Sequence, residues 1–82
     1  MRALLVIKPR KANGGETLVK SVELDDDALP HEGTSFRIAE LDRELDVFKV
    51  LTENVPDPEI HFRRNLTTIE AHTLKSLGWK KV

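Results

Sequence analysis

Ala3-Leu4-Leu5-Val6-Ile7 is the stretch that decides the fold, because five apolar residues follow one another there without a polar interruption. A strand with one face in water alternates apolar and polar residues, whereas a continuous apolar run is typical of a strand that is buried on both faces. Lys8-Pro9 ends the run, since proline has no N–H for a sheet ladder. We therefore expect a buried strand over residues 3–7.

The segment that follows predicts a partner for this strand. From Glu16 to Leu24, the residues Leu18, Val22 and Leu24 fall on one face and mostly polar residues on the other, which indicates a half-exposed strand. Asn13-Gly14-Gly15 lies between the two segments and favours a turn, because asparagine and glycine tolerate positive φ. Together they predict an antiparallel hairpin with a longer loop.

The middle of the chain is less decisive. Asp25 to Gly33 carries three aspartates, a proline and a glycine, so we expect a surface loop. In Ser35–Leu41, Phe36 and Ile38 alternate with polar neighbours as in a strand, but a helix that begins near Thr34 fits the same pattern. Both interpretations stay open.

Beyond this segment, the pattern favours an amphipathic helix over residues 43–53. Asp42 is a suitable N-cap, Glu44 suits the positive first turn, and Asn54 before Val55-Pro56 supplies a stop. A wheel with 3.6 residues per turn gathers five apolar side chains on one side. They are Val47, Phe48, Val50, Leu51 and Val55.

The C-terminal third predicts a strand and then a helix. Glu59–Arg64 alternates, with Ile60 and Phe62 expected inside and His61 and Arg63 outside. Thr67-Thr68-Ile69-Glu70 is a capping box, in which the Thr67 hydroxyl and the Glu70 carboxylate satisfy free backbone N–H groups and start a helix.

The end of this helix is also marked in the sequence. We expect Ile69, Leu74 and Leu77 on its inner side, Gly78 in the left-handed C′ position, and Trp79 packed back onto Leu74. Lys80-Lys81-Val82 is either a short terminal strand or a frayed tail. The whole pattern predicts one α+β domain over residues 1–82, with a small antiparallel or mixed sheet of three to five strands packed against two helices.

The sequence offers little for chemistry. It contains no cysteine, which excludes disulfides and thiolate sites. His31, His61 and His72 lack the close spacing of metal ligands, and Asp25-Asp26-Asp27 lacks the ligand pattern of an EF-hand loop. With no nucleophile or phosphate-loop motif either, we expect neither an enzyme nor a metal or other cofactor.

The longest apolar run is far shorter than a membrane span of about 20 residues, so we expect a cytoplasmic protein without membrane contact.

Charge is the most unusual feature of the chain, because a formal net charge of −1 hides a strong segregation. Residues 1–20 and 61–82 each carry a net charge of +4, and residues 21–60 carry twelve carboxylates against three basic side chains. If the fold brings the two termini together, their basic residues form one positive surface. The candidate partner-binding residues are Lys8, Arg10, Lys11, Arg63, Arg64, Lys80 and Lys81.

Without catalytic groups, a small domain acts mainly through binding. The leading hypothesis is therefore a non-enzymatic protein that binds a protein partner as an adaptor, regulator or inhibitor, since charged patches steer such encounters. Self-association through the acidic and basic surfaces belongs to this hypothesis. The alternative is a nucleic-acid-binding domain that uses the basic terminal segments, with Trp79 as a stacking face. A sequence pI of about 6.3 argues against that alternative.

Overall fold

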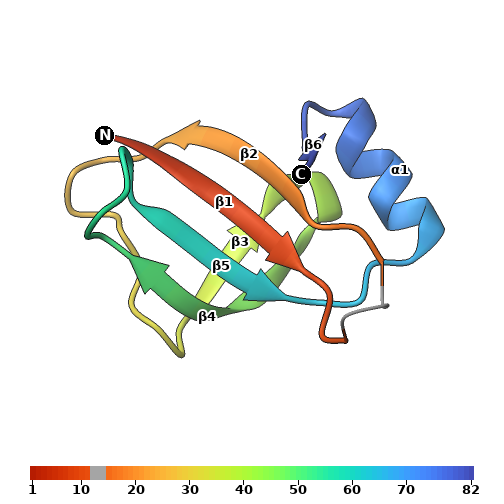
Figure 1. Ribbon diagram of the computed structural model, residues 1–82, viewed down its shortest axis with the longest axis horizontal. Coiled ribbons are helices and arrows are strands. Elements are labelled where there is room, and N and C mark those ends of the chain that lie inside the picture. The colour runs from red at the N-terminus through yellow and green to blue at the C-terminus, as the bar shows by residue number, and fades with distance from the viewer. Residues whose placement is uncertain (12–14) are drawn as a thin grey trace.

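The computed structural model describes residues 1–11 and 15–82, and in them it is built mainly of strands (Figure 1). Six strands and two helical segments follow one another along the chain. They are β1 (Arg2–Lys8), β2 (Leu18–Glu23), β3 (Ser35–Ile38), the short 3-10 helix η1 (Ala39–Leu41), β4 (Arg43–Leu51), β5 (Glu59–Arg63), α1 (Thr68–Ser76) and β6 (Lys80–Lys81).

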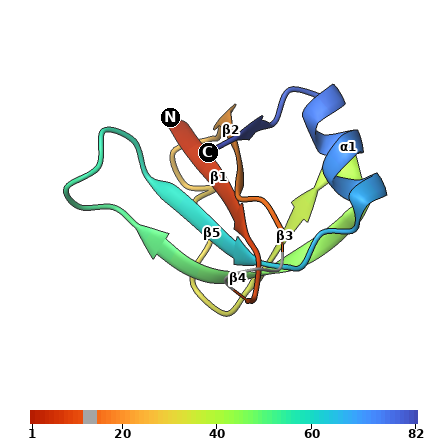
Figure 2. The same ribbon diagram turned by 45° about the vertical axis from the view of Figure 1, so that its right-hand side comes forward.

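The six strands form one mixed sheet in the order β3-β4-β5-β1-β2-β6. β1 and β5 pair in parallel, and the other neighbours are antiparallel. Figures 1 and 2 show that the sheet curls, so that β3 and β4 turn toward the side that carries α1. The result is an open half-barrel with β1 and β5 in its middle.

The inner side of this half-barrel holds the hydrophobic core. Residues on alternate positions of β1 and β5 face it, and Ile7 and Phe62 are register partners with no exposed surface. α1 packs against η1 and contributes Leu74, while Trp79 closes the same cluster from the segment before β6. Because α1 covers the open side of the curl, these two residues are buried although the sheet has no second layer.

Several predictions of local structure are confirmed. β1 is a buried strand and forms the expected antiparallel hairpin with β2, with Ile7 opposite Leu18. Of the turn predicted at Asn13-Gly14-Gly15, residues 13 and 14 lie outside the described residues. The loop at 25–33 contains neither strand nor helix, and the ambiguous segment 35–41 is a strand followed by a 3-10 turn.

The expected α+β architecture of three to five strands against two helices is wrong. The sheet has six strands, and α1 is the only helix longer than one turn within residues 1–11 and 15–82. The helix predicted over residues 43–53 is strand β4. Asp42 does not cap a helix N-terminus, since it ends η1 in the left-handed conformation with φ 51°.

A β-bulge explains why the apolar residues of β4 have the spacing of a helix in the sequence. Val47 is opposite Phe62 and Val50 is opposite Ile60, so both valines face the core although they are three positions apart. The register shift between Val47 and Lys49 inserts one residue and changes the alternation. In a helix, two residues three positions apart, such as Val47 and Val50, also lie on the same side. The helical wheel therefore predicted a helix where the structure has a strand.

At the C-terminal end the structure confirms one set of predictions and corrects another. The capping box at Thr67 and Glu70 is present, and Gly78 has φ 104°. The Trp79 N–H donates to the Leu74 carbonyl at 3.0 Å, which closes the predicted cap, and Lys80–Lys81 forms the short strand β6. However, Ile69 and Leu77 are 79% and 52% exposed, so the prediction that they line the inner side of the helix is wrong.

The direction predicted for the His61 side chain is confirmed, but its expected exposure is not. It points to the outer face of β5, as expected, but only 8% of it is exposed. β5 lies between β4 and β1, and their register partners Lys49 and Val6 flank the imidazole. Its Nε2 is 2.9 Å from Oε1 of Glu59, to which it is hydrogen-bonded.

No helix within residues 1–11 and 15–82 is long and apolar enough to cross a membrane.

Candidate functional site

The parallel pairing of β1 and β5 brings basic residues from distant parts of the sequence to one end of the sheet. Lys8 and Arg63 are register partners at the last pair of this ladder, so their side chains leave the same face. The chain then continues in step, because the Arg64 N–H donates to the Lys8 carbonyl at 2.9 Å and the Arg10 N–H to Oδ1 of Asn65 at 2.8 Å. We call Lys8, Arg10, Lys11 and Arg63 the basic end, and all four are exposed.

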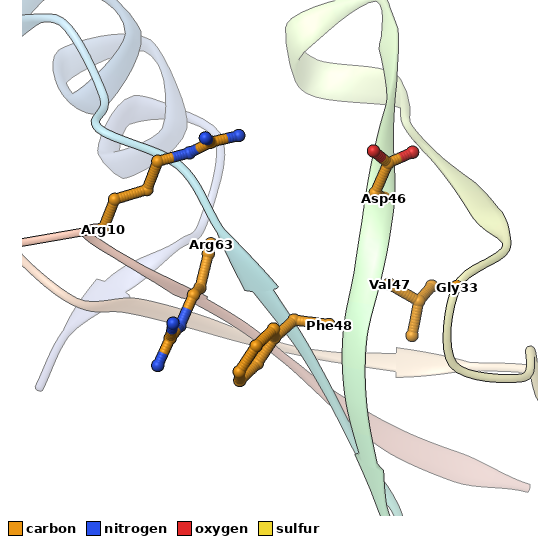
Figure 3. Close-up of a pocket in the computed structure, with 6 residues that line it drawn as sticks. All are labelled: Arg10, Gly33, Asp46, Val47, Phe48 and Arg63. Atoms are coloured by element: carbon orange, nitrogen blue, oxygen red, sulfur yellow. The ribbon is translucent and has the colours of Figure 1, made fainter.

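A hollow of about 480 Å³ opens beside the basic end. Figure 3 shows Arg10 and Arg63 on one side of it and the β4 residues on the other, with the ring of Phe48 directed toward Arg63. The residues that line the hollow are Arg10, Gly33, Asp46, Val47, Phe48 and Arg63. Two guanidinium groups, one aromatic ring and one carboxylate are therefore within reach of a single ligand.

Phe48 is a large apolar residue that lies at the protein surface. It is 48% exposed, and the guanidinium carbon of Arg63 lies 3.9 Å from the centre of its ring. This cation–π contact holds the arginine over one face of the ring, which contributes about 0.5 to 1 kcal/mol at an exposed site. The bulge in β4 makes the contact possible, since Phe48 is the inserted residue and projects from the outer face.

The basic end differs electrostatically from those basic residues that are held in ion pairs with a glutamate. Arg64, Lys20 and Lys75 each pair with a glutamate within 2.7 Å. Among residues 1–11 and 15–82, no carboxylate forms an ion pair with any residue of the basic end. Their charge is therefore available to a ligand, whereas that of the paired residues is already compensated.

Arg64 shows how such compensation works. Its guanidinium donates to Oε2 of Glu70, and the Thr67 N–H donates to Oε1 of the same carboxylate. Partial burial opposes the ionisation of Glu70, but the hydrogen bonds from Arg64 and Thr67 outweigh it and hold its pKa below the ordinary value. Arg64 thus stabilises the start of α1, although the sequence placed it among the partner-binding candidates.

The remaining candidates, Lys80 and Lys81, lie on another strand. β6 pairs with β2, so β2 separates both lysines from β1. Lys80 lines a different hollow, of about 290 Å³, together with Leu4, Val19 and Gly78 among others. The fold thus brings Lys8, Arg10, Lys11 and Arg63 together, places Arg64 in an internal ion pair and leaves Lys80 and Lys81 one strand away.

Phe48 and Asp46 are the site residues that the sequence interpretation missed. Phe48 was assigned to the apolar side of a helix, and Asp46 was not among the candidate residues. The alternation Leu45, Asp46, Val47, Phe48 carries the missing signal, because in a strand it places Asp46 and Phe48 together on the outer face.

The described residues of the basic end offer groups that are suited to binding. Within residues 1–11 and 15–82, no group of three or more histidine or carboxylate side chains is placed to hold a metal ion. His31 and His72 are exposed and lie on different elements, and His61 is hydrogen-bonded to Glu59. The guanidinium groups of the basic end are suited to carboxylates or phosphates, which they bind through paired N–H donors.

Comparison with protein families, with characterised proteins and with solved structures finds no match to this chain.

Proposed function

We propose that this protein is a small non-enzymatic binding protein that recognises a protein partner through its basic end, as an adaptor, regulator or inhibitor. One observation carries the proposal. Arg10 and Arg63 are exposed, lie outside the ion pairs formed by the described residues, and flank a hollow of about 480 Å³ beside the half-exposed Phe48.

The composition of this site suits a protein surface that is both acidic and apolar. Arginine and aromatic residues dominate the energetics of protein interfaces, because each buries a large area with little loss of conformational freedom. Arg10 and Arg63 would receive carboxylates, and the free face of Phe48 would receive an apolar side chain. Asp46, at the opposite wall of the hollow, would receive a donor of the partner.

Nucleic-acid binding is the alternative, and the structure gives it less support. Trp79, the expected stacking residue, is 2% exposed and its indole N–H is bound to Glu40. One face of Phe48 is covered by Arg63, which leaves only its other face for stacking with a base. Lys80 and Lys81 are separated from the basic end by β2, which shortens the positive track that a strand of nucleic acid would follow.

The test uses arginine substitutions at matched positions. The variant Arg10→Gln/Arg63→Gln removes two charges and keeps the polar side chains, and Arg2→Gln removes one exposed arginine at the far end of β1 as a control. A tagged chain is used to isolate a stoichiometric partner from nuclease-treated extract, and binding of the purified partner is then measured. We expect the double variant to bind about tenfold more weakly or worse, and Arg2→Gln to bind like the wild type.

Two results would overturn this proposal. One is a purified partner whose affinity for the double variant equals its affinity for the wild type. The other is tight binding of a single-stranded oligonucleotide that falls steeply with salt and is lost in Arg10→Gln/Arg63→Gln, since that result would favour the nucleic-acid alternative. Circular dichroism of each variant verifies that the fold is intact.

A further inference from the structure

The two ends of β1 have surroundings of opposite charge, although Arg2 at its start is itself basic. Its last residue lies at the basic end, while its first residues lie beside the acidic loop at 25–27, because the Leu24 N–H donates to the Met1 carbonyl at 2.8 Å. The β4–β5 connection reaches the same place, since the Leu4 N–H donates to the Pro58 carbonyl at 2.8 Å. Figure 1 shows both loops at the N-terminal end of β1. We call Asp25, Asp26, Asp27 and Glu53 the acidic end, and all four are exposed.

This charge is as available as that of the basic end. Of the four residues of the acidic end, only Asp26 takes part in an ion pair within the described part of the chain. Its carboxylate lies 3.4 Å from the N-terminal amine. Asp25 and Asp27 flank it on a projecting loop and pair with nothing in the described part of the chain. They can therefore enter a hollow on another molecule without first breaking a contact of their own.

We propose that the acidic end of one copy of this protein docks into the hollow at the basic end of a second copy. This inference rests on the proposed function, and it names the partner as another molecule of the same chain. Asp25 and Asp27 of one copy pair with Arg10 and Arg63 of the next. Each guanidinium then gains a carboxylate partner, which it lacks among the described residues of its own molecule.

The geometry makes this contact intermolecular. A seven-residue strand separates the two ends, and such a strand is about 20 Å long. The Debye length at physiological ionic strength is about 8 Å, so the acidic end of a molecule barely weakens the field at its own basic end. The contact is also head to tail, which leaves one free end of each kind and extends into chains unless a ring closes.

A mixing experiment tests the proposal with neutral substitutions. Arg10→Gln/Arg63→Gln keeps the acidic end, Asp25→Asn/Asp27→Asn keeps the basic end, and Asp26 stays in place to hold the N-terminal amine. Sedimentation velocity at increasing protein concentration and low salt measures the size of each species. The wild type is expected to form dimers and larger chains, each variant alone to associate about tenfold more weakly or worse, and the two variants mixed to stop at a one-to-one dimer.

Salt and a control variant sharpen the result. In about 0.5 M sodium chloride, where the Debye length is about 4 Å, association of the wild type should disappear. Arg2→Gln, which changes an exposed arginine outside the basic end, should still form chains.

The outcome also separates this inference from the proposed function. A wild type that stays monomeric at every concentration and low salt overturns the head-to-tail contact, as do variants that associate like the wild type. The proposed function survives such a result if a purified heterologous partner still requires Arg10 and Arg63. It fails with the inference only if that partner binds the double variant as well as it binds the wild type.

Discussion

The indole N–H of Trp79 donates a hydrogen bond to Oε2 of Glu40 at 2.7 Å, across 39 positions of sequence. The same oxygen accepts a bond from Nζ of Lys20 at 2.6 Å. One carboxylate thus joins the end of α1, the 3-10 helix η1 and the strand β2, at the place where the half-barrel is open. Because Trp79 is 2% exposed, its N–H has no access to water as a substitute partner.

Removal of this carboxylate should destabilise the protein. In Glu40→Ala the buried indole N–H loses its acceptor, which costs about 1 to 3 kcal/mol, and Lys20 loses its partner. Urea denaturation measures the free energy of unfolding. Glu32→Ala, which removes an exposed loop glutamate, is the control and should change it by less than about 0.5 kcal/mol. Equal unfolding midpoints for the two variants would contradict the role of Glu40.

Stability should fall in acid through Glu40 and Glu70. Burial opposes ionisation of both, but hydrogen bonds from Lys20 and Trp79 to one and from Arg64 and Thr67 to the other hold each pKa below the ordinary 4.5. Their contribution is complete above pH 4.5 and is lost as the pH falls through the lowered values, since the unfolded chain binds these protons first.

The measurement is the urea midpoint between neutral pH and about pH 3. A flatter profile is expected for Glu40→Gln than for the wild type, because that variant no longer has the Glu40 proton to bind. A profile as steep as that of the wild type would show that Glu40 does not contribute.

Gly78→Val should destabilise the C-terminal end of α1. Gly78 has φ 104°, which β-branched residues avoid, so the substitution is expected to cost about 1 to 2 kcal/mol. Space is not the reason, because an added Cβ would meet only Cε of Lys20 at 3.9 Å. Gly78→Ala should therefore also lose stability, as thermal unfolding can measure. An alanine variant as stable as the wild type would contradict an origin in backbone strain.

Phe48 and Phe62 provide a contrast between binding and stability. Phe62 has no exposed surface and packs against Phe36 with ring centres 5.8 Å apart, so Phe62→Ala should lose about 3 to 5 kcal/mol. Phe48→Ala removes a half-exposed ring and its contact with Arg63, and should lose less than about 1 kcal/mol. Under the proposed function, Phe48→Ala folds normally but binds the partner more weakly, and a large loss of stability in this variant would give Phe48 a structural role instead.

The sequence predicted those elements whose signals are local. The apolar run before Lys8, the alternation around Ile60, and the capping box at Thr67 each depend on neighbours within a few residues, and the structure contains all three elements. Gly78 belongs to the same group, since the requirement for positive φ arises within the helix end itself.

β4 could not be predicted in this way, because its identity depends on a distant partner. Val47 and Val50 both face the core only through the bulge, and that bulge is defined by the pairing with β5. The error removed one strand from the expected sheet and added one helix. It also hid Phe48, so the candidate site was predicted as charge alone, without its aromatic residue or the hollow.

The charge pattern of the sequence identified basic residues of the site, but it did not show which basic residues are held in ion pairs. The counts along the sequence identified Lys8, Arg10, Lys11 and Arg63, which the fold gathers at the end of β1 and β5. They could not show that Arg64 is held by Glu70, since that contact requires the start of α1 to lie against the end of β5.

The parallel ladder of β1 and β5 has a consequence for how the molecule forms. Its ends, and the nearby bond from Arg10 to Asn65, join positions 55 residues apart, so the nascent chain must lengthen by most of the domain before the central pair can close. Until then, β1 pairs only with β2, and its other edge is open to the surroundings. Folding dominated by such distant pairings takes milliseconds to seconds. During synthesis this edge is the place where a chaperone, or another unfinished chain, would first engage the protein.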